Sequence, residues 1–271
     1  MPSRFRGLLD LLIPLQCSQC QAWLHSREDP APSLCGPCLL ALPWLDPLAC
    51  TGCQQRPPRG GEGRCAACAN TPSALESGTA AVWYTGPVEA WITRFKYPRR
   101  GLGGLDPAPL AVARTLACAA AANVPSARPE AVIPVPMHPQ RFRSRGFNPP
   151  GVAARDIARA FGLPLEPEGL LRTRDTPSQT GLGRAERRRN VQGVFQARRH
   201  PATRVWLVDD VVTTGATLEA CAAALRAAGA LRVDAVALAR TPAPATDLSG
   251  PYDSLRPPRS RRADDRDPQA S

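Results

Sequence analysis

Two different spacings of apolar residues alternate along the chain between residues 79 and 240. Short apolar runs, several rich in valine, predict strands within the segments TAAVWYTG, AVIPVPMHP, TRVWLVDDV and LRVDAVALAR. Between them, apolar residues recur every three or four positions and predict helices over 88–97, 108–122, 149–162 and 216–230. Strands that alternate with helices are typical of an α/β domain, so we expect a mostly parallel sheet with helices on both faces.

The two ends of the chain have other patterns. Residues 5–13 carry apolar side chains at the spacing of a short amphipathic helix. The same stretch is similar to a short signal peptide, but Asp10 interrupts its apolar run and Gln16 is a poor cleavage residue before Cys17. Residues 241–271 are rich in proline and charge, which predicts a disordered tail. Because no apolar run is long enough to cross a bilayer, we expect a cytoplasmic protein without membrane insertion.

Eight of the ten cysteines form four C-x-x-C pairs near the N-terminus: Cys17 and Cys20, Cys35 and Cys38, Cys50 and Cys53, Cys65 and Cys68. Two such pairs can complete one tetrahedral metal site, so the spacing predicts two structural zinc ions. Disulfides are disfavoured in a reducing compartment, and redox pairs would not recur four times. Consecutive pairing gives a double zinc ribbon within residues 1–70, while an interleaved arrangement stays open. Cys118 and Cys221 lie in alanine-rich helical patterns and are expected in the core.

The charge of the chain indicates an anionic partner. The formal net charge is +11, and arginine supplies nearly all of the positive charge. Lys96, in the segment RFKY, is the only lysine, which makes it a candidate for a specific contact that an arginine would not replace.

The most informative segment is VWLVDDVVTTGATL, residues 205–218. Ligands of parallel sheets bind beyond the carboxyl ends of the strands, where we expect Asp209 and Asp210 to follow the strand 205–208. The turn 213–217 leads into a helix, whose first N–H groups favour a phosphate. Carboxylates suit sugar hydroxyls, so the pattern indicates a sugar that carries a phosphate.

This segment resembles the phosphoribosyl pyrophosphate motif of type I phosphoribosyltransferases. Together with IPVPMHPQRFRSRGFN, PSQTGLGRAERRRNVQGVF, RFKY and the cysteine pairs, it resembles the ComF family of competence-associated proteins. The resemblance implies a phosphoribosyltransferase-like domain over residues 71–240. It also implies Mg²⁺ bound with phosphoribosyl pyrophosphate, and single-stranded DNA and DNA-uptake proteins as partners. One departure is Asn148-Pro149-Pro150, where a glutamine is expected after the asparagine.

The resemblance also assigns site residues. Asp209 and Asp210 would hold the ribose hydroxyls, and the 5'-phosphate would lie on Thr213, Thr214, Gly215, Ala216 and Thr217. The pyrophosphate side would be formed by Val135, Pro136 and Met137. Two further candidates come from the residues themselves: Arg145 in RGFN, because arginine forks suit phosphate oxygens, and Lys96 in RFKY.

Three further features bear on how such a site would work. Arginines at 141, 143 and 145, and at 184 and 187–189, could bind phosphate. The segment 173–190 is polar and could close over the site. Trp83, Tyr84, Phe95 and Tyr97 are the aromatic residues best placed to stack on DNA bases.

No residue of the sequence identifies a nucleophile or a base for transfer, and His25, His138 and His200 are equally compatible with structural roles. Two functions therefore remain. The first is a binding protein that uses the sugar pyrophosphate while handling single-stranded DNA in transformation. The alternative is a phosphoribosyltransferase with an unidentified acceptor.

Overall fold

The computed structural model describes residues 16–24, 34–55, 63–98, 100–101, 104–105, 108–125, 128–174, 191, 193–198 and 202–242. The expected N-terminal helix, nearly all of the expected tail, and residues 175–190 with their four arginines lie outside these ranges, as do His25 and His200.

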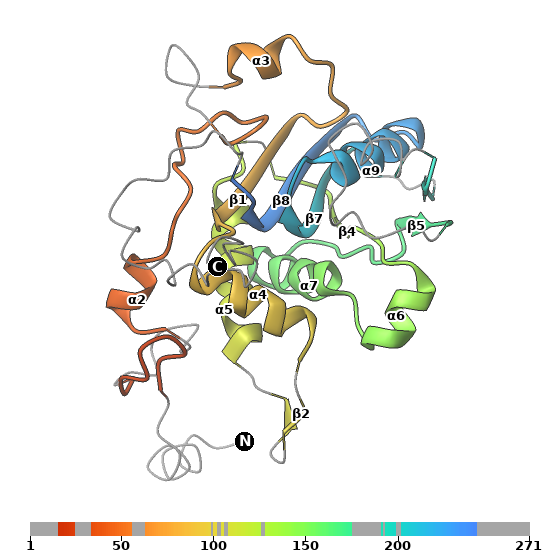
Figure 1. Ribbon diagram of the computed structural model, residues 1–271. Helices are drawn as coiled ribbons and strands as arrows, with labels where there is room; N and C mark the ends of the chain where they lie inside the picture. Colours follow the sequence, from red (N-terminus) through yellow and green to blue (C-terminus); the bar gives the residue numbers. More distant parts are fainter. Residues whose placement is uncertain are drawn as a thin grey trace, which may run out of the picture.

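A four-stranded parallel sheet forms the centre of the molecule (Figure 1). Its order is β1 (Ser77–Trp83), β8 (Arg232–Arg240), β7 (Arg204–Val212) and β4 (Ala131–Pro134). The two central strands, β7 and β8, have almost continuous buried runs, as expected for strands that are covered on both faces. The prediction of a parallel sheet is confirmed.

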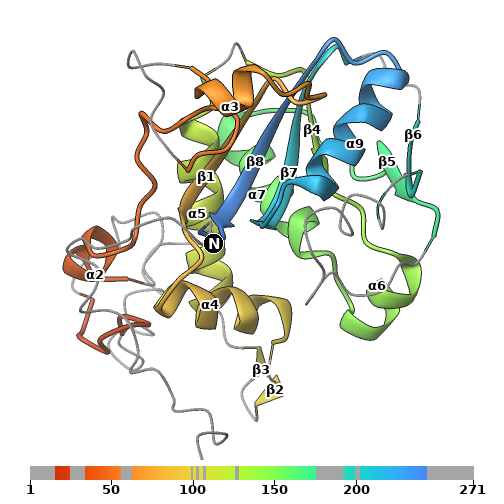
Figure 2. The same ribbon diagram turned by 45° about the horizontal axis from the view of Figure 1, so that its top comes forward.

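Helices cover both faces of this sheet (Figure 2). One face carries α4 (Pro87–Lys96), α5 (Ala108–Ala122) and α7 (Pro149–Phe161). The other carries α9 (Ala216–Ala227) and a small hairpin of β5 (Leu170–Arg172) and β6 (Phe195–Ala197). Each of these helices matches a predicted one to within a few residues.

The alternation of side chains along β7 divides the core into two clusters. Trp206 and Val208 pack with α5 and α7, whereas Val205 and Leu207 pack with α9 and the β5–β6 hairpin. Cys221 is completely buried in the second cluster, as predicted, and Cys118 is partly buried. A hairpin of two short strands, β2 (Arg100–Gly101) and β3 (Gly104–Leu105), follows α4.

The cysteine region contains the same local structure twice. In each copy the second cysteine is followed by a glutamine with positive φ, which is 60° at Gln21 and 53° at Gln54. In each copy the third cysteine precedes a short helix, which is α2 (Gly36–Leu40) or α3 (Ala66–Ala69). The chain therefore repeats a tight cysteine turn followed by a helical cysteine pair.

The cysteine region is hydrogen-bonded to the sheet. The backbone N–H of Leu45 donates to Ala81 O at 2.9 Å, and the N–H of Trp83 donates to Pro43 O at 2.8 Å. The N–H of Gly78 donates to Thr51 O at 2.7 Å. The segment around residue 44 thus covers the free edge of β1, which would otherwise expose unpaired backbone groups.

Candidate functional site

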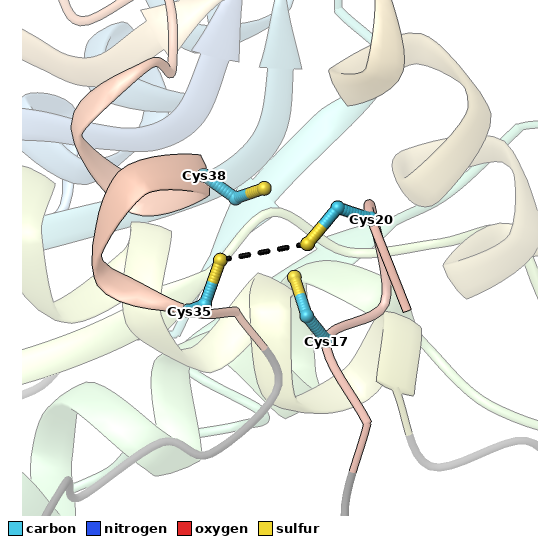
Figure 3. A group of neighbouring side chains, drawn as sticks. All are labelled: Cys17, Cys20, Cys35 and Cys38. Atoms are coloured by element: carbon cyan, nitrogen blue, oxygen red, sulfur yellow. Dashed lines mark hydrogen bonds between the residues drawn. The ribbon is translucent and has the colours of Figure 1, made fainter. Parts of the chain in front are cut away.

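The eight paired cysteines form two separate four-thiol groups. Figure 3 shows the first group, in which the sulfur atoms of Cys17, Cys20, Cys35 and Cys38 point toward one another. The second contains Cys50, Cys53, Cys65 and Cys68, and within each group the sulfur atoms lie within 4.8 Å of one another. Pairing is therefore consecutive, and the interleaved alternative is excluded. Each group could hold one metal ion.

Both groups favour one ionised thiol without any metal. Burial raises the pKa of Cys17, but backbone N–H donors from neighbouring residues outweigh burial, and the pKa falls to about 6. Cys50 has the same balance and a pKa of about 6. Burial and the neighbouring thiols raise the pKa of Cys38 and Cys68 instead. A cation bound among the four sulfur atoms would relieve this repulsion between thiolates.

The predicted binding residues converge on one pocket at the carboxyl edge of the sheet. This pocket has a volume of about 490 Å³. Its walls come from the end of α4, the loop after β4, the short helix α6 (Pro139–Arg145), the end of β7 and the first turn of α9. All twelve predicted residues except Thr214 line it: Lys96, Val135, Pro136, Met137, Arg145, Asp209, Asp210, Thr213, Gly215, Ala216 and Thr217.

The two adjacent aspartates lie differently from the expectation. Strand β7 does not end at Val208 but continues to Val212, because it stays paired with β8 as far as Arg240. Asp209 and Asp210 are therefore inside the strand, and alternation directs them to opposite faces of the sheet. Both still line the pocket, because the shorter strand β4 pairs with β7 only as far as Val208 and leaves this end open.

Asp210 and Lys96 form an ion pair on the α4 face of the sheet. Lys96 Nζ lies 3.0 Å from Asp210 Oδ1, and the two side chains are 23% and 11% exposed. Burial lowers the pKa of Lys96, but the charges and hydrogen bond of the aspartates outweigh burial and raise it overall. The only lysine thus has a specific partner in the pocket.

Asp209 lies on the α9 face. Its charge adds to the burial that raises the pKa of Cys221 in α9. Burial, followed by the charge of Asp210, raises the pKa of Asp209 to about 7, although its Oδ1 accepts a hydrogen bond from Asp210 N at 2.8 Å. The positive charge of Lys96 lowers the pKa of Asp209, but by less than burial and Asp210 raise it, so Lys96 does not offset the cost of ionising Asp209.

The loop 213–217 forms the N-terminal side of α9. Gly215 has φ of +78°, a conformation that favours glycine, and a Cβ atom built there meets nothing within 4 Å. Thr214 differs from the prediction: it lines a neighbouring pocket, and its Oγ1 accepts a long hydrogen bond from Ala216 N at 3.4 Å. The loop still exposes the backbone start of a twelve-residue helix to the pocket.

Arg145 makes two contacts with Tyr97 at the rim. Its Nη2 donates to Tyr97 Oη at 2.7 Å, and its guanidinium carbon lies 4.5 Å from the centre of the tyrosine ring. Both residues line the pocket together with Arg141. An arginine held in this way keeps the rest of its fork available for anionic oxygen atoms.

Asn148, which is not among the predicted binding residues, also lines the pocket. Its Nδ2 donates to Val135 O at 3.1 Å and so fixes the loop after β4. Among the described residues, its buried Oδ1 has no hydrogen-bond partner. Pro149 and Pro150 begin α7 and donate no backbone N–H. Pro149 occupies the position of the expected glutamine, and Pro150 lines the pocket.

The interpretation of the aromatic residues was wrong for Phe95. This side chain is 4% exposed and packs against Phe147, with ring centres 5.8 Å apart. Trp83 and Tyr84 are partly buried, whereas Tyr97 is 62% exposed. His138 has a structural contact: its Nδ1 accepts a hydrogen bond from Gln140 N at 3.3 Å and caps the helix α6 (Pro139–Arg145).

A second, larger pocket lies between the second cysteine group and the start of α9. Its volume is about 1170 Å³, and it shares Val212, Thr213, Gly215, Ala216 and Leu218 with the first pocket. Glu219 of α9 crosses to the cysteine region by accepting hydrogen bonds from Ser73 Oγ, at 2.9 Å, and from Ala74 N. The loop 213–217 is therefore supported from the cysteine side.

Fold and site define an α/β protein with two four-cysteine groups and a pocket lined by acidic and basic residues at the carboxyl edge of its sheet. No protein-family model matches the chain. It is 35% identical over 116 residues to Competence protein F of Haemophilus influenzae, a match that covers 41% of this chain and 51% of that protein. It is 28% identical over 227 residues to DNA utilization protein YhgH of Salmonella typhi, covering 83% of this chain and 90% of that protein.

These similarities confirm the predicted resemblance to competence-associated proteins. A solved glutamine phosphoribosylpyrophosphate amidotransferase from B. subtilis, in complex with ADP and GMP, is 22% identical, with a TM-score of 0.35. The match covers 58% of this chain and 31% of the amidotransferase chain. Within the described part of the chain, every helix is too short or too polar to span a membrane.

Proposed function

We propose that this protein acts in the uptake and use of DNA during natural transformation, and that its smaller pocket binds phosphoribosyl pyrophosphate. The names of its relatives support the first part. The observation that carries the second is the convergence of acidic, basic and helix N-terminal groups from four separate elements on one pocket.

Each part of the ligand has a chemically matched wall. The 5'-phosphate lies on the loop 213–217, where the N–H groups of α9 and the threonine hydroxyls donate to its oxygens. Asp209 and Asp210 accept hydrogen bonds from the ribose hydroxyls. The pyrophosphate lies between the loop 135–137 and Arg145, whose guanidinium is held in place by Tyr97. Lys96 orients Asp210 through their ion pair.

Mg²⁺ fits the donor set on the Asp209 side. This carboxyl has a pKa of about 7 because burial and Asp210 disfavour its charge, and a bound cation would reverse that preference. Mg²⁺ prefers carboxylate and phosphate oxygens, so Asp209 and the pyrophosphate would hold it together. When bound, the ion would neutralise charge on the pyrophosphate.

Zn²⁺ fits the two four-thiol groups. Four sulfur donors without a carboxylate or an open position are typical of structural zinc. Because α2 and α3 contain no buried residue, metal binding would supply the folding energy that these two short helices lack.

The test of this function uses purified protein with labelled phosphoribosyl pyrophosphate, Mg²⁺ and candidate acceptors, including single-stranded DNA. Retention of intact ligand supports a binding protein, whereas release of pyrophosphate with one acceptor supports the transferase alternative. In parallel, a transformable strain that lacks the protein should regain DNA uptake with the wild type but not with Asp209→Asn/Asp210→Asn. Full uptake with that variant would contradict the link between pocket and transformation.

A further inference from the structure

The short helix α6 (Pro139–Arg145) is held by its ends rather than by packing. None of its seven residues is buried. Pro139 begins the helix behind the His138 cap, and Gly146, with φ of 87°, ends it by donating to Phe142 O at 2.7 Å. A helix this short is marginal on its own, so the caps at its two ends account for its position.

Positive charge is concentrated around this helix. Arg141, Arg143 and Arg145 lie on α6, and the sequence contains no Asp or Glu from residue 131 to residue 155. Arg141 and Arg145, one helical turn apart, line the smaller pocket. Arg143 does not line it and is exposed. The helix therefore has a pocket face and an outer face, and both carry guanidinium groups.

Two exposed aromatic rings accompany these arginines. Phe142 is 47% exposed on α6, between two arginines in the sequence. Tyr97 is 62% exposed and is joined to α6 through Arg145. An apolar ring costs free energy when exposed to water, so its position between charged groups indicates a ligand with both apolar faces and negative charge.

We propose that α6 and Tyr97 form a docking surface for single-stranded polynucleotide at the rim of the smaller pocket. Bases stack on Phe142 and Tyr97, while Arg143 and the neighbouring arginines bind the backbone phosphates. A duplex keeps its bases stacked inside and offers only its phosphates, so the surface selects single strands. The proposal rests on the proposed function in that it names where the DNA lies relative to the sugar-pyrophosphate pocket.

The location of α6 gives this surface a consequence for the pocket. Figure 2 shows α6 apart from the helices that cover the sheet. Arg145 belongs to both regions, since it lines the pocket and contacts Tyr97. A bound strand that stacks on Tyr97 therefore acts on the same guanidinium that faces the pyrophosphate, and the two ligands influence each other's affinity.

The test measures binding of a fluorescein-labelled oligodeoxythymidylate to full-length protein by anisotropy. Phe142→Ala should weaken binding about tenfold, the loss expected for one stacked base. Arg143→Gln should reduce the slope of log affinity against log salt by about 0.7. Arg159→Gln, which removes an exposed arginine from the outer part of α7, is the matched control and should change neither quantity.

Further arms separate base stacking from a plain apolar contact and from attraction between charges alone. Phe142→Leu keeps the apolar surface, and the proposal predicts a loss close to that of Phe142→Ala; wild-type affinity in the Leu variant would overturn stacking. Equal affinity for duplex DNA or for polyglutamate would overturn the choice of single strands and indicate a general polyanion or acidic protein surface. Calorimetry with phosphoribosyl pyrophosphate, run on each variant, shows the fold and pocket to be intact. If Phe142→Ala binds both phosphoribosyl pyrophosphate and DNA as the wild type does, the docking surface is refuted while the proposed sugar-pyrophosphate pocket still stands.

Discussion

Replacing Asp209 by Asn should stabilise the folded protein, and more so as the pH rises. The carboxyl has a pKa of about 7 in the folded protein, against an ordinary value of 3.8, because burial and Asp210 oppose its ionisation. A raised carboxyl pKa means that the folded state binds the proton more tightly than the unfolded state. Its contribution to stability is present below pH 3.8 and is lost as the pH rises through 7.

The magnitude follows from the difference between the two pKa values. Three pH units correspond to about 4 kcal/mol of lost stability between acidic and alkaline pH. About 2.5 kcal/mol of this falls between pH 5 and pH 8. Asn retains an oxygen that can accept from Asp210 N but cannot ionise, so the variant should escape the loss.

The measurement is equilibrium unfolding by urea of both proteins at pH 5 and pH 8, at the same ionic strength and without ligand. The four-cysteine groups also respond to pH, but equally in both proteins, so the difference between them isolates Asp209. We expect the advantage of the Asn variant to grow by about 2.5 kcal/mol from pH 5 to pH 8. An advantage that is equal at both pH values would refute the account of Asp209.

Three other changes test separate parts of the structure. Lys96→Met leaves the nearly buried Asp210 without its cation and should lower the free energy of unfolding in urea by about 2 kcal/mol. Adding Asp210→Asn should recover much of this loss of stability. No recovery would mean that the ion pair is not the cause. Cys53→Ser should leave one metal ion per chain by elemental analysis. It should weaken phosphoribosyl pyrophosphate binding more than the matched Cys20→Ser, because the second cysteine group adjoins the loop 213–217. Equal effects of the two substitutions would contradict that coupling. Gly215→Val should fold but bind phosphoribosyl pyrophosphate more weakly in calorimetry, since φ of +78° disfavours a β-branched residue. Unchanged affinity would mean that the loop 213–217 is not part of the site.

Most of the architecture could be predicted because each main element carries its own spacing. The buried apolar runs predict β7 and β8, and the apolar stripe predicts α7. Gly162 predicts the end of α7, and it has the left-handed conformation that is common for glycine at that position. Consecutive pairing of the cysteines could not be predicted, since spacing alone permits both arrangements.

The site was predictable in its residues but not in their orientation. The length of β7 depends on its pairing with β8, so the sequence did not reveal that Asp209 and Asp210 lie inside the strand on opposite faces. Lys96 is a candidate from its rarity and its place in RFKY, but its partner Asp210 could not be predicted because the two residues are far apart in the sequence. Phe95 was predicted to stack on bases, but the periodicity of α4 directs it into the core.

The most direct test of the central claim is calorimetric titration of the full-length protein with phosphoribosyl pyrophosphate in the presence of Mg²⁺, beside the Asp209→Asn/Asp210→Asn variant. We expect saturable binding to the wild type and a loss of about 1 to 3 kcal/mol in the variant, because charge-assisted hydrogen bonds to the ribose become neutral ones. Ribose 5-phosphate, which lacks the pyrophosphate, should bind both proteins more weakly. Absence of binding to the wild type, or equal affinity in the double variant, would contradict the assignment of this pocket to the sugar pyrophosphate.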